Sequence, residues 1–198
     1  MTGRSFLDVL MSKKGGLVNA TRTYVVTGRE RHVDVARDGK LPYPQRAIRT
    51  ADFLYIRNFA PDRWPMGSPE GAGANKAIRA TPHDGPIETN TYAAFPDMDA
   101  SPTKAWIVAH QDDTEIRPLF ALAFAKRPSE ELYDVRNDPD EMKNHAEDPA
   151  FAETKRQLAS QLIAELTRTG DPRLTGDGST FDKPPFAGSG ETEADRPK

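Results

Sequence analysis

Hydrophobic residues recur at helical spacing in the segment that follows Asp148. Asp148 is a good helix N-cap, Pro149 occupies the favoured first helical position, and Gly170 is placed to end the helix. The apolar positions share one face, as expected of a helix that packs on a sheet; they are Phe151, Leu158, Leu162, Ile163 and Leu166. The pattern therefore predicts a long helix with one buried face near the C-terminus.

Alternation of apolar and polar residues predicts strands in three other places. Residues 45–50 and 53–59 alternate apolar with basic or polar side chains, and residues 51–52 between them suit a tight connection. These two segments are expected to form a β-hairpin. Residues 21–27 have the β-branched and aromatic composition of a strand, and residues 131–135 predict a further strand beside the hairpin.

The remaining segments predict short helices and long loops. Residues 5–11, 102–111 and 116–126 read as short helices, and the last two have apolar faces that need burial. Residues 60–103 contain seven prolines, so we expect little regular structure there. Together the pattern predicts an α+β fold: a small antiparallel sheet of three to four strands, a long C-terminal helix packed on it, and long irregular loops.

The length of 198 residues favours one domain with a genuine core. We expect residues 1–20 to be a connector and residues 21–170 to form the folded unit. From Asp171 onward there is no periodicity, so residues 171–198 are expected to be an extended, partly disordered tail.

The net charge of −3 conceals an asymmetry between the halves of the chain. Residues 1–80 sum to +7 and the remainder to −10. A basic first half suits an anionic partner, because long-range attraction raises encounter rates. The alternative is that these arginines pair with nearby acids.

Several classes of protein are excluded or left unsupported by composition. The chain has no cysteine, which removes disulfides, thiolate metal sites and a cysteine nucleophile. No apolar run approaches the roughly 18 residues needed to cross a bilayer, and residues 1–20 lack the pattern of a signal peptide. We therefore expect no membrane partner, and the sequence does not indicate a compartment.

Three ordered segments carry a resemblance to a known family. They are TGRERH at 27–32, LPYPQRAIRTADFLYIRNFAPDRWPMG at 41–67 and KRPSEELYDVRNDPDEMKNHAEDPAFA at 126–152. They resemble the C-terminal region of formylglycine-dependent sulfatases related to heparan N-sulfatase. The segment TGDPRLTGDGSTFD at 169–182 is similar to the ends of many bacterial members, so the resemblance runs from about Gly3 to Pro185.

The resemblance implies a supporting role rather than catalysis. Family members hydrolyse sulfate esters or sulfamates with a formylglycine made in a Cys/Ser-x-Pro-x-Arg motif, beside a calcium ion held by aspartates with an asparagine or histidine. This chain has no cysteine, and none of its serines is followed two residues later by proline. Formylglycine and calcium are therefore implied for the intact enzyme and not for this chain.

The same resemblance implies the partners of the chain. The C-terminal part of the family is a small sheet with a long helix that docks beside the catalytic domain and borders the pocket for the sulfated carbohydrate substrate. Residues 1–20 would then connect to that catalytic domain. Family members are usually exported. The isolated chain is expected to expose the docking face and to form homo-oligomers or aggregates through it.

Five residues are candidates for substrate contact. Arg29, Arg31 and His32 lie at a predicted strand end, where guanidinium groups can bind a sulfate or carboxylate through paired hydrogen bonds. His32 is the strongest candidate to face the pocket, whereas the arginines could instead bond Glu30 or a neighbouring domain. Tyr43 and Arg46 form a second pair, for which a structural role is the favoured alternative.

The other acidic residues and histidines are weaker candidates for a metal or catalytic site. None of the acidic groups has the spacing of a calcium loop, so solvated acids are expected; the groups are Asp97 with Asp99, Asp112 with Asp113, and Asp171 with Asp177 and Asp182. The histidines His83, His110 and His145 are isolated.

Two further functions compete with the sulfatase subdomain. One is a stand-alone binding module for anionic glycans built on the same fold. The other is nucleic-acid binding, which ranks last because no recognised motif or aromatic stacking platform is present. We therefore expect no nucleic-acid partner.

Overall fold

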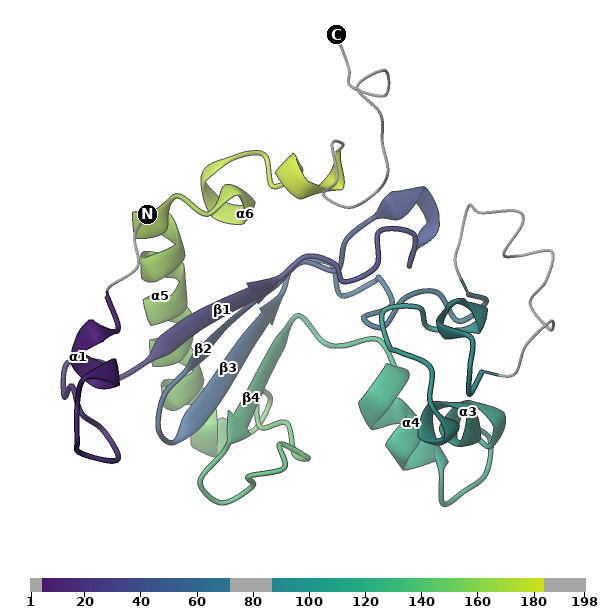
Figure 1. Ribbon diagram of the computed structural model, residues 1–198, viewed down its shortest axis with the longest axis horizontal. Helices are drawn as coiled ribbons and strands as arrows, with labels where there is room; N and C mark the ends of the chain where they lie inside the picture. The colour runs from purple at the N-terminus through teal and green to yellow at the C-terminus, as the bar shows by residue number, and fades with distance from the viewer. Residues whose placement is uncertain (1–4, 72–86, 184–198) are drawn as a thin grey trace, which may run out of the picture.

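Four strands form one antiparallel sheet in which each strand pairs with the next along the chain (Figure 1). The computed structural model describes residues 5–71 and 87–183. The strands are β1 (Val25–Arg29), β2 (Gln45–Arg49), β3 (Phe53–Asn58) and β4 (Glu130–Asp134). With the long helix α5 (Ala152–Thr169), they give the α+β fold that the sequence predicts.

The β2–β3 hairpin is confirmed, with Thr50, Ala51 and Asp52 between its strands. The Thr50 N–H donates to the Phe53 carbonyl at 2.9 Å and closes the turn. Strand β1 begins at Val25, four residues later than expected, because the Arg22 N–H bonds the Asn19 carbonyl at 3.0 Å and holds the preceding residues in a turn.

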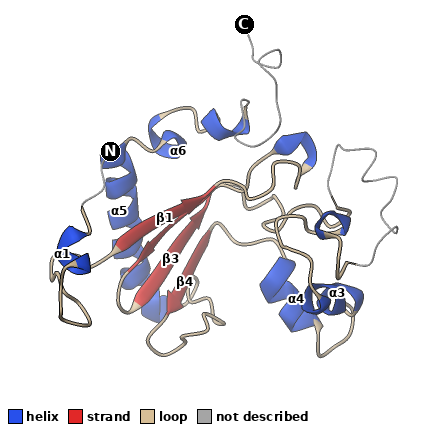
Figure 2. Ribbon diagram, in the orientation of Figure 1, coloured by secondary structure: helices blue, strands red, loops and turns tan. Residues whose placement is uncertain are grey.

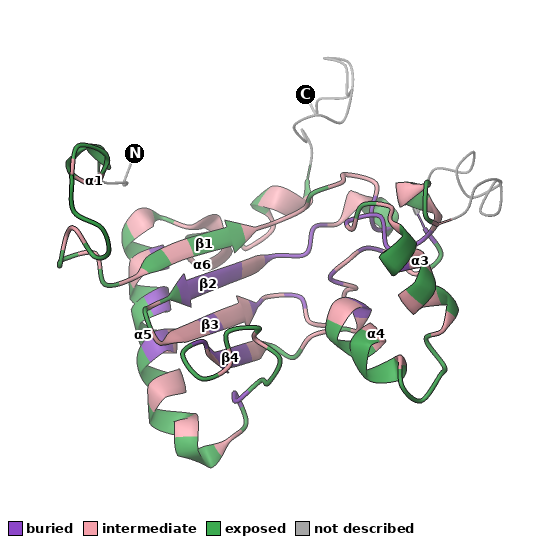
Figure 3. Ribbon diagram, turned by 60° about the horizontal axis from the view of Figure 1, so that its bottom comes forward, coloured by how far each residue is buried: buried purple, intermediate pink, exposed green. Residues whose placement is uncertain are grey.

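Helix α5 covers one face of the sheet (Figures 1 and 3). The Asp148 carboxylate accepts a hydrogen bond from the Ala150 N–H at 3.0 Å, before a 3₁₀ turn at Pro149–Phe151 that leads into α5. Gly170 ends the helix with a φ of 71°, in the left-handed region that favours glycine. The predicted cap, first turn and end are all confirmed.

The main core lies between α5 and the sheet. Its buried side chains are Ile48, Tyr55, Leu132, Ala146, Leu158, Leu162 and Leu166. The predicted apolar stripe was wrong at Ile163, which is 50% exposed. Successive residues of a helix are separated by about 100° around its axis. Leu162 lies at the centre of the buried stripe, so Ile163 lies to one side of it.

A second core holds together the short helices α3 (Pro102–Ala109) and α4 (Arg117–Phe124). Its buried residues are Ala94, Phe95 and Phe124. Both helices lie away from α5, beyond the sheet (Figure 2). The prediction that both apolar faces are buried is confirmed only in part: Phe124 is buried against the loops before α3, whereas Trp106 and Leu119 are 57% and 44% exposed.

Lys104 anchors this second core from α3. Its side chain is buried, and Nζ donates to the carbonyl oxygens of Thr91, Phe95 and Met98 at 3.2, 3.2 and 2.6 Å. Burial lowers the pKa of Lys104 to about 8, against an opposing effect of Asp99. The ammonium group therefore ties three backbone carbonyls of an irregular loop to a helix.

The segment after α5 is not the extended tail that we expected. Asp171 accepts a hydrogen bond from the Arg173 N–H at 2.9 Å and caps α6 (Pro172–Thr175). A 3₁₀ turn follows at Thr180–Asp182. The rest of the predicted tail, residues 184–198, lies outside the described residues.

Residues 5–20, the part of the N-terminal segment that the structure describes, include no buried residue. Helix α1 spans Leu7–Leu10, and its large apolar side chains are exposed. The other short elements are the 3₁₀ turns at Asp38–Lys40 and Thr91–Ala93. None of the helices in the described ranges is both long and apolar enough to span a bilayer.

Candidate functional site: an arginine–carboxylate cluster at the end of the first strand

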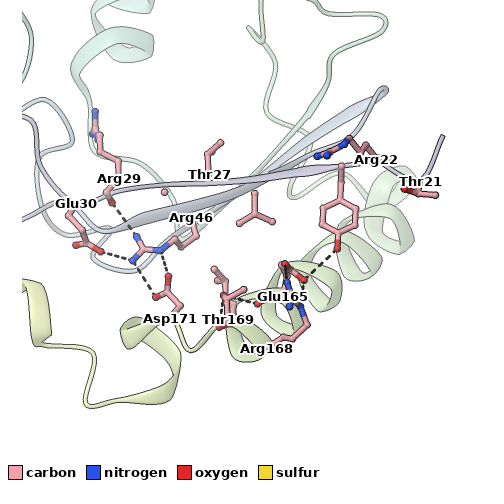
Figure 4. Close-up of a pocket in the computed structure, with 14 residues that line it drawn as sticks. Thr21, Arg22, Thr27, Arg29, Glu30, Arg46, Glu165, Arg168, Thr169 and Asp171 are labelled. Atoms are coloured by element: carbon pink, nitrogen blue, oxygen red, sulfur yellow. Dashed lines mark hydrogen bonds and ion pairs between the residues drawn. The ribbon is translucent and has the colours of Figure 1, made fainter. Parts of the chain in front are cut away.

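Arg46 of β2 is the centre of a group of charged side chains at the end of β1. It lies on the sheet face that α5 covers, and its side chain passes beneath Gly28, where a Cβ would approach Arg46 Cδ to 2.8 Å. Its Nε donates to Asp171 at 2.7 Å and its Nη2 to Glu30 at 2.8 Å (Figure 4). Glycine at position 28 therefore makes room for this guanidinium.

Arg173 of α6 completes the group. It donates to Glu30 through Nε at 3.2 Å and Nη2 at 2.5 Å, and to Asp182 through Nη2 at 2.8 Å. We call Arg46, Arg173, Glu30, Asp171 and Asp182 the arginine–carboxylate cluster. The two arginine side chains are only 7% and 5% exposed, and each has two carboxylate partners.

Phe181 and Arg63 border the cluster. The Phe181 ring centroid lies 6.0 Å from the guanidinium carbon of Arg46 and 5.6 Å from that of Arg173, within cation–π range. Arg63 Nη2 lies 3.3 Å from Asp182. These contacts fold the segment after α5 back onto the strands.

For Asp171, Arg46 and Arg173, hydrogen bonds and attraction to groups of opposite charge together shift the pKa more than burial does. Burial opposes ionisation of Asp171, but hydrogen bonds from Arg46 and from the Arg173 N–H lower the pKa of this carboxyl below its usual value. Burial also disfavours the charged forms of Arg46 and Arg173, yet their hydrogen bonds to carboxylates raise the pKa of both. Asp171, Arg46 and Arg173 are therefore charged at neutral pH, and each of the two guanidinium groups is paired with two carboxylates.

A groove of about 860 Å³ runs between β1 and the C-terminal half of α5. We call it the β1 groove; its lining includes Tyr24, Val26, Gly28, Arg46, Leu166 and Thr169. Three of its arginines already have carboxylates within 4 Å, namely Arg22 with Asp8, Arg46 with Asp171 and Arg168 with Glu165. The fourth arginine, Arg29, donates to the Pro65 carbonyl, so most of the positive charge that lines the groove is paired with carboxylates.

Arg29 and Tyr43 meet in a second polar cluster with Arg37. Arg29 and Arg37 both donate to the Pro65 carbonyl, at 2.8 and 2.7 Å, and the guanidinium carbon of each lies 5.8 Å from the Tyr43 ring centroid. Arg37 Nη2 also bonds Asp97 at 2.5 Å. This arrangement favours the structural alternative for Arg29.

Tyr43 is fully buried. Its hydroxyl has no hydrogen-bond partner among the described residues. Burial, with a further contribution from Glu131, raises the pKa of Tyr43 to about 12. Two guanidinium groups lie near the ring, and the hydroxyl is not presented at the surface.

Arg31 and His32 differ in their surroundings. Arg31 Nη2 donates to the Phe181 carbonyl, and burial lowers the pKa of Arg31. The His32 side chain is 61% exposed, with Nε2 3.9 Å from Asp99 of the neighbouring loop. Among the candidate residues, His32 is therefore the one most accessible to another molecule.

The expectation of solvated acids was wrong for Asp97, Asp171 and Asp182, the last of which pairs with Arg173 at 2.8 Å. The Asp97 side chain is completely buried against Arg37, and Asp171 pairs with Arg46. The expectation is confirmed for Asp99 and Asp177, whose side chains are 86% and 68% exposed. In the described ranges no three His, Asp or Glu side chains are grouped as a metal site would require; His83 lies outside them.

Sequence reasoning missed the partners that neutralise the arginines. One signal was available: Asp171-Pro172 repeats the pairing of an N-cap aspartate with a first-turn proline seen at Asp148-Pro149. It would have predicted α6 and so placed Arg173 in a folded turn. Neither Arg37 with Asp97 nor Arg173 with Glu30 had a local signal, because these pairs are 60 and 143 residues apart.

Comparison with known proteins adds one short similarity. No protein-family model matches the chain. A segment of 56 residues is 38% identical to an uncharacterized protein of Haemophilus influenzae. That segment covers 28% of this chain and 29% of the Haemophilus protein. A similarity of this extent names no activity.

Proposed function

We propose that this chain is the C-terminal, non-catalytic subdomain of a formylglycine-dependent sulfatase of the heparan N-sulfatase-like type. In the intact enzyme it completes the fold and borders the pocket in which sulfate esters or sulfamates of sugars are hydrolysed. The observation that carries the proposal is where the resembling segments fall. TGRERH contains the end of β1, residues 41–67 contain β2 and β3, and residues 126–152 contain β4 and the start of α5.

The arginine–carboxylate cluster supports a scaffolding role. Buried ion pairs that are fully matched fix one arrangement of the chain but leave little charge for a ligand. Here they hold the segment after α5 against the end of β1. His32, exposed just beyond that strand, is the residue that we propose borders the pocket.

The residues of this chain do not fit the two groups that the family requires. Formylglycine needs a Cys/Ser-x-Pro-x-Arg motif, which the sequence lacks. Calcium needs several oxygen ligands, and in the described part of the chain no such acidic group converges. Both groups therefore belong to the catalytic half in this proposal.

A sulfate-release assay on the purified chain tests the absence of catalysis. We expect no release from N-sulfated or O-sulfated oligosaccharides above a blank, with an authentic sulfatase as positive control. Release that scales with the concentration of the chain and survives repurification would contradict the proposal.

Retention on a heparin column separates the proposal from a stand-alone glycan-binding module. Because Arg37, Arg46 and Arg173 are neutralised internally, we expect weak retention that is lost at physiological salt. Retention that persists above physiological salt, and that depends on exposed cationic side chains, would favour the binding module instead.

A further inference from the structure

The two edge strands of the sheet, β4 and β1, differ in whether their outward backbone groups have hydrogen-bond partners. At the β4 edge, the Leu132 N–H donates to the Asn144 side chain at 2.9 Å, and the Leu132 carbonyl accepts from the His145 N–H at 2.7 Å. The loop after β4 therefore satisfies the outward backbone groups of Leu132, the central residue of that strand. A covered edge cannot pair with another chain.

The β1 edge is open over its central residues. The Thr50–Phe53 hydrogen bond shows which backbone groups of β2 point toward β3. Because this direction alternates along a strand, the backbone groups of Ala47, and of the residues two positions away on either side, point toward β1. Thr27 pairs with Ala47, so the backbone groups of Val26 and Gly28 point outward. Within the described ranges no hydrogen bond reaches these outward groups.

The surroundings of this edge leave space for another strand. Val25, Thr27 and Gly28 are exposed, and the Val25 side chain is 57% exposed. The β1 groove runs beside the edge (Figure 4). Apolar Val26 and Leu166 belong to its lining. An added strand could place every second side chain in this groove.

We propose that β1 pairs antiparallel with β1 of a second copy of this chain, about a two-fold axis at Thr27. Val26 of each copy then forms a hydrogen-bonded pair with Gly28 of the other. Thr27 faces its own counterpart in a non-hydrogen-bonded pair, where Cα atoms are about 4.5 Å apart. The two sheets become one continuous sheet.

The occupant is a second copy because β1 is complementary to itself in this register. Arg29, the only charged residue of the strand, lies opposite Val25 of the other copy rather than opposite a second arginine. Thr27 opposite Thr27 is a favourable cross-strand pair. A two-fold axis at Arg29 would oppose like charges, and one at Thr27 pairs all the residues of β1.

A cysteine substitution tests the register without interference, because the chain has no native cysteine. Thr27→Cys places two thiols within disulfide reach across the axis. We expect mild oxidation to convert most of this variant to a covalent dimer. The matched control is Ser160→Cys on the exposed side of α5, which we expect to form no disulfide-linked dimer. Cross-linking of Thr27→Cys no faster than that of Ser160→Cys would overturn the proposal.

Charge substitutions provide a second test. Thr27→Lys and Thr27→Glu alone each set like charges across the axis, so each is expected to sediment as a monomer, whereas their mixture restores a dimer. Unfolding curves confirm that both variants fold. A wild-type chain that stays monomeric at all concentrations, or an unmixed Thr27→Lys dimer, would overturn the proposal. The proposed dimer does not depend on the sulfatase assignment, because both tests measure association and not activity.

Discussion

Arg46 Nε donates to Asp171 Oδ2 at 2.7 Å and joins the second strand to the first residue beyond the Gly170 cap, 125 positions later. The same guanidinium bonds Glu30 at the end of β1. A single buried side chain therefore links two strands and the segment after the long helix. This link explains why a segment without hydrophobic periodicity is nevertheless folded.

Removing the charge of Asp171 should destabilise the fold. In Asp171→Asn, Arg46 keeps Glu30 but loses its other carboxylate, so we expect a loss of about 3 kcal/mol, at the low end for breaking a buried ion pair. Urea unfolding measures it. The matched control Asp177→Asn changes a side chain that is 68% exposed and should cost less than about 0.5 kcal/mol. Equal effects in the two variants would show that the Arg46–Asp171 pair contributes nothing.

A methyl group at position 28 should collide with Arg46. The Cβ of Gly28→Ala would lie 2.8 Å from Arg46 Cδ, and the Arg46 side chain cannot move aside easily because Asp171 and Glu30 hold its end. Overpacking of this kind costs about 1 to 3 kcal/mol. Gly15→Ala is the control, because its Cβ would meet nothing within 4 Å. A Gly28→Ala variant as stable in urea as Gly15→Ala would contradict the close approach.

Stability should rise with pH between about pH 8 and pH 10. The pKa of Lys104 is lowered to about 8 in the folded chain from an ordinary value of 10.5, so in this window the unfolded state binds more protons. The gain is at most about 3 kcal/mol at about 1.4 kcal/mol per pKa unit. Above pH 10 the raised pKa of Tyr43 acts in the opposite direction.

Urea midpoints measured at pH 7, 8, 9 and 10 check this prediction. In Lys104→Met the rise should disappear, because the titrating group is gone. A wild-type midpoint that stays flat or falls over this range would contradict the account of Lys104.

Alanine substitutions at two adjacent positions of α5 should lower the free energy of unfolding by very different amounts. Leu162 is 1% exposed, so Leu162→Ala should cost about 2 to 5 kcal/mol. Ile163 is half exposed, so Ile163→Ala should cost about 0.5 kcal/mol. Thermal and urea unfolding measure both. Similar costs at both positions would mean that α5 is rotated relative to the sheet.

Much of the fold could be predicted because its elements have local signals. Asp148, Pro149 and Gly170 mark the ends of the last helix by hydrogen bonding and backbone conformation alone. The β2–β3 hairpin follows from alternation and a short connection. The start of β1 was less predictable, because the turn that Asn19 stabilises competes with the β-branched residues after it.

The candidate site was less predictable because its partners are distant in sequence. The positions of Arg29, Arg31 and Arg46 were visible, but their partners Pro65, Phe181 and Asp171 belong to segments without periodicity. Charge patterning indicated a basic half and could not show that much of it is neutralised inside the fold. His32 stands apart because no buried partner holds it, and its role at a pocket stays a prediction.

Peptide mapping of the natural protein by mass spectrometry tests the central claim most directly. The account predicts that these residues belong to one polypeptide with an upstream Cys/Ser-x-Pro-x-Arg segment in which the first residue has become formylglycine. A natural polypeptide that contains these residues and has no such segment would contradict the assignment to a sulfatase.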